Sequence, residues 1–273
     1  MKSFYRALLA ALTVGVLSPV SLFAQEPQLP ELVTDRPDFT ESSDVVGAGI
    51  MQLEFGTSFE GDGQADARDR VLTTPLALLR VGVSRRIELR FGSDGYIFDR
   101  LGSGLGQATA RGQADLEIGA KVVLRDGASG FGMAVIPMMS LPTGANSMST
   151  GTVDPTVKFT WATNLPKAFG LSGNVNVSRL GDDLGRYTEQ ALSVSLAHGL
   201  PAGWGGYWET YGFMPQGDER ASAWTVNTGV THSMGGNAQL DLEIGRGVTA
   251  AAPDWFVGVG VGIRTAALRP RRR

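Results

Sequence analysis

The alternation of apolar and polar residues is the main structural signal in this chain. Between residues 50 and 264, segments of about ten residues place apolar side chains at every second position, with polar ones between them. In the first of these segments Leu53 and Phe55 alternate with Gln52 and Glu54. Because neighbouring side chains of a strand point to opposite faces, each segment predicts a strand with one apolar and one polar face.

About twelve such segments occur, an even number, as single-chain bacterial outer-membrane barrels require. They span residues 50–60, 71–83, 87–97, 114–124, 131–141, 153–162, 169–179, 187–198, 204–214, 223–232, 238–247 and 254–264. In the segment 204–214 both parities carry aromatic side chains, so the sequence leaves its facing open. The pattern predicts an all-β fold of antiparallel strands.

One five-residue phrase recurs within these strands. It reads QLEFG at 52–56 and DLEIG at both 115–119 and 241–245, with a relative, IELRFG, at 87–92. The irregular spacing argues against a solenoid, whose repeats keep a fixed period. In a barrel, Leu and Ile of the phrase would face lipid, its carboxylates would face a watery lumen, and its glycine would leave space there or let the strand coil. The phrase is therefore interpreted as one strand solution used several times.

The connections between the predicted strands alternate in length. Long polar connections (61–70, 98–113, 142–152, 180–186, 215–222 and 248–253) alternate with shorter ones (84–86, 125–130, 163–168, 199–203 and 233–237). Transmembrane barrels place long loops outside the cell and short turns in the periplasm. The sequence thus predicts an antiparallel transmembrane β-barrel with short periplasmic turns, longer extracellular loops and both termini in the periplasm. A soluble secreted β-sandwich is the alternative.

The first residues predict export. Lys2 and Arg6 precede a short apolar run, and residues 18–24 form a cleavage region that ends at Ala24, which is the layout of a secretory signal peptide at 1–24. An uncleaved anchor is the alternative, but the run is shorter than the ~20 residues a spanning helix needs. The further predicted divisions are 25–49, a segment before the barrel; 50–264, the barrel; and 265–273, a basic tail. The predicted location is the bacterial outer membrane.

Composition narrows the range of functions. The chain has no cysteine, so no disulfide holds it together. Its formal net charge of -3 excludes a nucleic-acid partner recognised through overall basicity. The expected partners are outer-membrane lipid, a small-molecule solute and the outer-membrane assembly machinery, and no cofactor is expected.

Charged residues on the inward parity are candidates for a pore lining that selects solutes. They are Glu54, Glu88, Arg90, Asp115, Glu117, Lys121, Lys158, Asp241 and Glu243. An equally strong interpretation is that these residues form mutually compensating ion pairs that fill the interior.

The stretch before the first strand, LVTDRPDFTESSDVVGAG at 32–49, is rich in residues that favour turns. In an eight-stranded barrel, side chains fill the interior. A barrel of about twelve strands is wider and has room inside for a peptide segment. Asp35, Arg36 and Asp38 are candidates for a plug in which Arg36 binds inward carboxylates. An ordered periplasmic lead-in is the alternative.

Residues that would indicate an enzyme or a metal site are few. His198 and His232 lie near predicted strand ends, with no Cys, Asp or Glu at metal-ligand spacing. No G-x-S-x-G context accompanies them. The glycine-rich GSGLGQ at 102–107 does not open a helix, so it does not predict a phosphate site. No catalytic residue and no metal are therefore predicted.

Several motifs carry a family resemblance. The opening TDRPDFTES at 34–42, the strand MQLEFGTSF, DLEIGAK at 115–121, PMMSLPTG at 137–144 and DWFVGVGVGIR at 254–264 resemble the bacterial outer-membrane family labelled "putative MetA-pathway of phenol degradation". The resemblance spans essentially the whole mature chain. It implies a barrel for uptake of small organic, often aromatic, compounds. The chain departs from the usual terminal aromatic residue, since TAALRPRRR follows Arg264.

Together these observations predict an outer-membrane channel for passive uptake of small organic molecules, aromatic ones among them. The alternative from a different class is a structural or interaction barrel with a plugged lumen and no transport activity.

Overall fold

The computed structural model describes residues 32–64, 67–103, 106–182, 184–217 and 219–265. In these ranges the chain forms fourteen strands, β1 (Met51–Gln64), β2 (Ala67–Gly82), β3 (Ile87–Ser93), β4 (Tyr96–Ser103), β5 (Gly106–Gln113), β6 (Leu116–Arg125), β7 (Phe131–Leu141), β8 (Asp154–Leu165), β9 (Phe169–Asp182), β10 (Gly185–Gly199), β11 (Trp204–Pro215), β12 (Ala223–Ser233), β13 (Ala238–Gly247) and β14 (Trp255–Arg264). The predicted signal peptide at 1–24 and all but the first residue of the predicted basic tail lie outside the described ranges. None of the described helices has the length and apolar character needed to cross a membrane.

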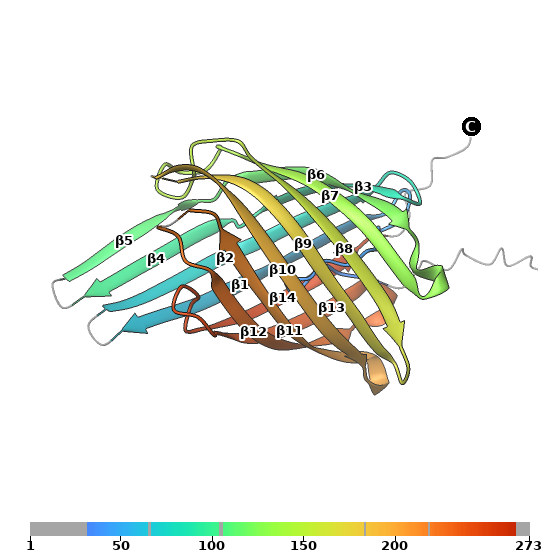
Figure 1. Ribbon diagram of the computed structural model, residues 1–273. Coiled ribbons are helices and arrows are strands. Elements are labelled where there is room, and N and C mark those ends of the chain that lie inside the picture. Colours follow the sequence, from blue (N-terminus) through green and yellow to red (C-terminus); the bar gives the residue numbers. More distant parts are fainter. Residues whose placement is uncertain (1–31, 65–66, 104–105, 183, 218, 266–273) are drawn as a thin grey trace, which may run out of the picture.

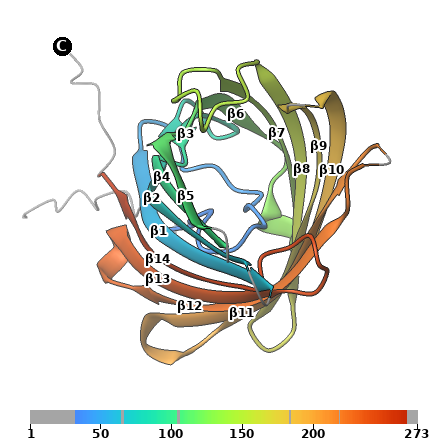
Figure 2. The same cartoon turned by 90° about the vertical axis from the view of Figure 1, so that its left-hand side faces the viewer.

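The strands form one antiparallel sheet that closes on itself. β1 pairs with β2 on one side and with β14 on the other, where the register runs from Gln52 opposite Arg264 to Gly61 opposite Trp255. The closed ring is visible end-on in Figure 2. Closure pairs the backbone groups of the first and last strands, which hydrocarbon could not hydrogen-bond.

At two positions in the wall, two consecutive shorter strands take the place of one long strand. β3 and β4 both pair with β2, one after the other, and β5 and β6 pair in the same way with β4 and β3. The wall of the described chain therefore has twelve positions, as the sequence predicts. The break lies opposite Pro75, which has no N–H to donate to a neighbouring strand. Gly95, at the break, has a φ of 70°, and a Cβ there would collide with the Pro75 carbonyl.

Two predicted loops are strands in the structure. The prediction of a loop at 98–113 is wrong, because most of these residues form the β4–β5 hairpin, and residues predicted as the loop 61–70 extend β1 and β2. Both hairpins project from one end of the barrel (Figure 1). Strands outside the bilayer need no apolar face, so the glycine-rich and polar sequence of these hairpins hides their strand character.

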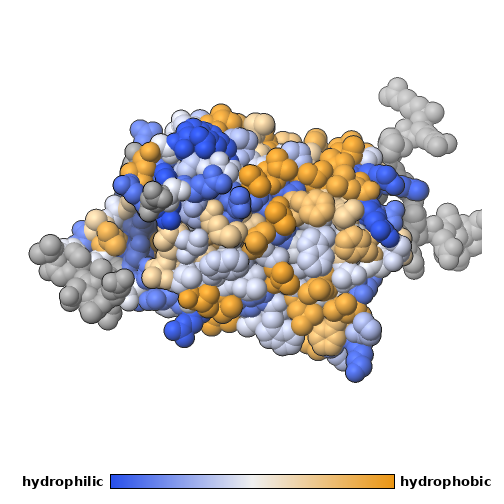
Figure 3. Space-filling view, in the orientation of Figure 1, coloured by the Kyte–Doolittle hydropathy of each residue, from blue (hydrophilic) through white to orange (hydrophobic). Residues whose placement is uncertain are grey.

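The two faces of the wall differ as the alternation predicts. Leu242 and Ile244 of β13 point outward and are 50% and 59% exposed, whereas Asp241 and Glu243 point inward and are 4% and 9% exposed. On the side seen in Figure 3, apolar residues gather on the middle of the wall and hydrophilic ones toward its ends. This sidedness, together with closure, confirms the transmembrane β-barrel fold.

The facing of β11, which the sequence leaves open, is settled in the structure. Trp204 and Trp208 point outward, with exposed fractions of 48% and 59%. Tyr207 and Glu209 point inward and are buried. Both parities carry aromatic residues because this strand has rings on the lipid side and on the lumen side.

Candidate functional site

Residues 32–49, called here the lumenal segment, lie inside the barrel (Figure 2). The segment reaches β1 at the end of the barrel that carries the short turns, where Gly49 donates to the Gly82 carbonyl at 2.9 Å. Its beginning lies at the same end, since Leu32 shares a cavity with Leu200 and Gly203 of the short turn before β11. The segment is therefore a loop that enters and leaves through one mouth.

Asp35 is the centre of a cationic cluster on one side of the lumen. Its carboxylate lies 2.6 Å from Arg90 Nη1, 2.8 Å from Lys121 Nζ and 3.4 Å from Arg80 Nη1. Burial would raise the pKa of Asp35, but the cations of Arg80, Lys121 and Arg90 outweigh it and hold the pKa well below its ordinary value. Asp35 is thus an anion held by β2, β3 and β6 together.

Wall carboxylates complete this cluster. Arg80 donates to Glu88 Oε1 at 2.9 Å and to Glu54 Oε1 at 3.0 Å. The same carboxylates also bind the backbone of the lumenal segment, since Glu54 accepts from the Asp35 amide at 2.8 Å and Glu88 from the Val46 amide at 2.9 Å. Removing one member would leave buried charges unpaired, which is costly.

Glu41 ties the lumenal segment to a third part of the wall. Its carboxylate lies 2.6 Å from Lys158 Nζ and 3.3 Å from Arg90 Nη2. Burial raises the pKa of Glu41, but the positive charges of Arg90 and Lys158 lower it by a larger amount. The resulting pKa is about 2. The cationic side of the lumen therefore spans β2, β3, β6 and β8.

The opposite side of the lumen is acidic. Asp241 of β13 lies 3.1 Å from Arg36 Nη2, and Glu209 of β11 accepts from the backbone amides of Phe39 at 2.9 Å and Thr40 at 2.8 Å. Glu243 accepts from the Tyr207 hydroxyl at 3.3 Å. The lumenal segment thus lies between a basic wall and an acidic wall and pairs with both.

Arg36 separates two cavities. One, of about 160 Å³, is lined by Arg90, Glu117 and Lys158 as well as Arg36. The other, of about 430 Å³, lies toward the short turns and is also lined by Arg36, with Tyr207 and Gln239 among its other residues. Arg36, which pairs with Asp241, therefore lies between a smaller outer and a larger inner cavity.

Glycines of the wall provide the seat of Arg36. A Cβ at Gly56 of β1 would lie 2.6 Å from Arg36 Cζ, and a Cβ at Gly260 of β14 would lie 2.6 Å from Arg36 Nη2. Since real Cβ atoms do not approach other atoms so closely, the guanidinium occupies the space of two absent side chains. The position of Arg36 depends on the seam between β1 and β14.

An aromatic cluster joins the lumenal segment to β11. The ring of Phe39 stacks on Tyr211 with centroids 4.7 Å apart and meets Phe213 edge-on at 5.3 Å. Tyr211 and Phe213 belong to β11, and Phe39 to the lumenal segment. The cluster places apolar ring surface inside an otherwise charged lumen.

Most of the predicted lining residues point into the lumen. Glu54, Glu88, Arg90, Lys121, Lys158, Asp241 and Glu243 do so, and Glu117 lines the smaller cavity. Asp115 has a different role: it accepts hydrogen bonds from the Gly144 amide at 2.8 Å and the Ser149 hydroxyl at 3.0 Å, so it holds the loop 142–153 at the outer rim. Of the three plug candidates, Asp35 and Arg36 form ion pairs with the wall. Asp38 is the third, and burial together with the neighbouring Glu209 raises the pKa of its carboxyl group well above its ordinary value.

Sequence reasoning missed Arg80, Glu209, Glu41, Phe39 and Tyr211. Arg80 has the parity opposite to the apolar Leu79 and Val81, so the alternation could have found it. Glu209 and Tyr211 were hidden by the undecided facing of β11. Nothing in the sequence indicates the partners of Glu41 and Phe39, because the lumenal segment has no periodicity.

The two histidines make ring contacts. His198 lies 4.2 Å from the Phe169 ring and His232 lies 4.5 Å from the Trp204 ring, measured between centroids. Among the described residues there is no group of three or more His, Asp or Glu side chains arranged to bind a metal.

The closed wall, the outward apolar face and the charged lumen with a peptide inside define the class: a twelve-stranded transmembrane β-barrel of the bacterial outer-membrane type. The model of the family described as "Putative MetA-pathway of phenol degradation" matches residues 34–265. The chain belongs to this family, as its motifs indicate.

Solved structures support the fold. The COG4313 outer membrane channel from Pseudomonas putida F1 is similar with a TM-score of 0.58 and 14% identity, over 82% of this chain and 98% of that one. The transport unit of the autotransporter AIDA-I from Escherichia coli has a TM-score of 0.51 and 9% identity, over 80% and 89% of the two chains. A KdgM porin in complex with disordered oligogalacturonate has a TM-score of 0.50 and 11% identity, over 78% and 98%. No curated protein matches the chain.

Proposed function

We propose that the protein is a passive outer-membrane channel for small organic molecules, with the lumenal segment narrowing the route. The observation that carries this proposal is a pair of cavities within a closed wall, both of them lined by Arg36. A solute would pass between the basic and acidic walls, where charge rings and a narrow radius select it. Outer-membrane lipid surrounds the barrel, and the assembly machinery inserts it.

Aromatic solutes are the finer part of the proposal. The rings of Phe39, Tyr211 and Phe213 offer stacking surface inside the lumen. The family description supports the same substrate class, since it refers to phenol degradation. The similar structure from Pseudomonas putida F1 is described as an outer membrane channel.

A second candidate function is a structural barrel whose lumen is closed. The observation in its favour is the density of ion pairs around Asp35, where three cations hold one carboxylate. Such a cluster resists rearrangement, because breaking any pair leaves a buried charge unpaired.

Single-channel currents in planar bilayers distinguish these functions. We expect the full mature chain to give a small conductance, and a variant lacking residues 34–46 to give a larger one, since the deletion removes Asp35, Arg36 and Glu41 while keeping the turn at Gly49. Conductance from the deletion variant alone would favour the closed structural barrel. If neither protein conducts, although a heat-dependent gel shift shows that both are folded, the channel proposal is wrong.

A further inference from the structure

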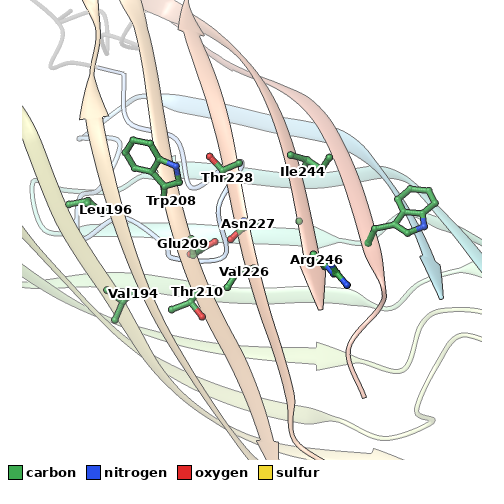
Figure 4. Close-up of a pocket in the computed structure, with 12 residues that line it drawn as sticks. Val194, Leu196, Trp208, Glu209, Thr210, Val226, Asn227, Thr228, Ile244 and Arg246 are labelled. Carbon is green, nitrogen blue, oxygen red and sulfur yellow. The ribbon is translucent and has the colours of Figure 1, made fainter. Parts of the chain in front are cut away.

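A groove crosses the outer wall over β10, β11, β12 and β13 and reaches Trp255 of β14 (Figure 4), with a volume of about 690 Å³. Its shape follows from side-chain size along rows of cross-strand neighbours. In one row Thr228 lies between Trp208 and Ile244, each 59% exposed. The two large side chains form the banks of the groove, and the small Thr228 forms part of its floor.

The second row ends in a cation. Val226 pairs with Thr210 on one side and with Arg246 on the other, so a guanidinium closes a groove whose other lining is mainly apolar. Arg246 directly precedes Gly247, where β13 ends at its extracellular side. Within the described part of the chain, no hydrogen bond or ion pair to Arg246 is found.

The position of the groove determines what it can hold. It lies on the lipid-facing side of the wall, with its apolar floor at the level of hydrocarbon and Arg246 at the level of lipid head groups. An unpaired guanidinium at this level is complementary to phosphate, which it binds in a forked geometry.

We propose that this groove is a binding site for a phosphorylated lipid of the outer leaflet, one acyl chain lying between Trp208 and Ile244 and a head-group phosphate paired with Arg246. The site is separate from the lumen and does not depend on transport. It fixes one lipid against β10–β13, unlike the mobile lipid around the rest of the wall.

The role of the Arg246 charge is tested by titrating the purified mature protein in detergent with bis-phosphorylated lipid A. Lipid binding is followed by native mass spectrometry. Arg246→Ala should weaken binding about tenfold, equivalent to roughly 1.4 kcal/mol, and Arg246→Lys should restore part of it. The matched control is Arg179→Ala, since Arg179 is an exposed cation near the outer end of β9 that donates to the Thr188 hydroxyl. Equal losses for both alanine variants would overturn the proposal.

The groove itself is tested by filling it. Val226→Trp should block the acyl chain and weaken binding as much as Arg246→Ala, whereas Val177→Trp, on the outward face of β9, should leave binding unchanged. Lipid A stripped of its phosphates should bind no better to the native protein than to Arg246→Ala.

Three results contradict this site: equal binding of the phosphorylated and phosphate-free lipids, binding unaffected by Val226→Trp, or a dimer in which a second copy protects the groove. Single-channel currents of Arg246→Ala should equal those of the native protein, which separates failure of this site from failure of the channel.

Discussion

The glycine that ends each repeated five-residue phrase leaves space for a different neighbour. A Cβ at Gly56 would meet the guanidinium of Arg36, one at Gly119 would meet Met138, and one at Gly245 would meet the ring of Phe256. The three copies therefore share a need and not a partner: each strand must approach an inward group that a side chain would displace.

Gly260 provides a residue-scale prediction. We expect Gly260→Ala to push Arg36 off Asp241, because the nearest atoms to the new Cβ all belong to the flexible end of Arg36. Docking of the lumenal segment should weaken by roughly 1–3 kcal/mol, the usual effect of losing a hydrogen bond to a buried group. Planar-bilayer currents should become larger or noisier.

The control for this substitution is Gly170→Ala, where nothing lies within 4 Å of the new Cβ. Both variants should keep the heat-dependent gel shift of a folded barrel. Unchanged currents in Gly260→Ala would show that Arg36 does not limit the route.

At this scale the sequence predicts which residues point inward, but not what they bind. Alternation is a property of one strand, so it assigns Glu54 and Lys121 to the lumen. The pairing of Asp35 with Lys121 joins positions 86 residues apart in the chain and depends on the path of a segment without periodicity. No local pattern encodes that path.

At the scale of elements, the outer rim is built by strands that continue beyond the wall. The β4–β5 hairpin begins where Pro75 and Gly95 interrupt the regular pairing, and the loop 142–153 packs against it, with the Ala145 amide donating to the Gln113 carbonyl at 2.8 Å. The alternation predicts the strands of the wall but not the interruption, since it predicts 71–83 and 87–97 each as one unbroken strand.

Asp115 carries the prediction for this element. Asp115→Ala removes the acceptor of Gly144 and Ser149, so the loop 142–153 should detach from the rim at a cost of roughly 1–3 kcal/mol. Limited proteolysis should cut within this loop faster than in the native protein. Asp126→Ala, which removes one exposed hydrogen bond at a short turn, is the control and should leave the cleavage rate unchanged. Equal rates for Asp115→Ala and the native protein would contradict the anchoring role.

At the scale of the whole molecule, stability depends on an unbroken apolar circumference. β14 contributes Val257, Val259 and Ile263 to the outer face beside the seam with β1. The fold class was predictable because sidedness and closure follow from the bilayer as solvent. The contents of the lumen were not, since water there tolerates many arrangements of charge.

An arginine placed on the outer face of β14 tests how deep each position lies in the bilayer. Val259→Arg, near the middle of β14, should destabilise the barrel by roughly 2–4 kcal/mol, and Val257→Arg, two residues nearer the outer rim, should destabilise it less. The measurement is the free energy of unfolding in guanidinium for protein folded into vesicles. Similar losses at both positions would contradict the assigned depth.

Both ends of the lumenal segment lie at the mouth with the short turns, and this decides how the segment can move. A peptide that passed through the tube from one side to the other could be removed only by being pulled along its length or by parting the seam. A loop inserted from one side can withdraw through the same mouth while every strand of the barrel stays hydrogen-bonded to its neighbours. Retraction of the segment toward the periplasm is therefore open to the intact barrel, and it is opposed by the ion pairs, the hydrogen bonds and the ring contacts that join the segment to the wall.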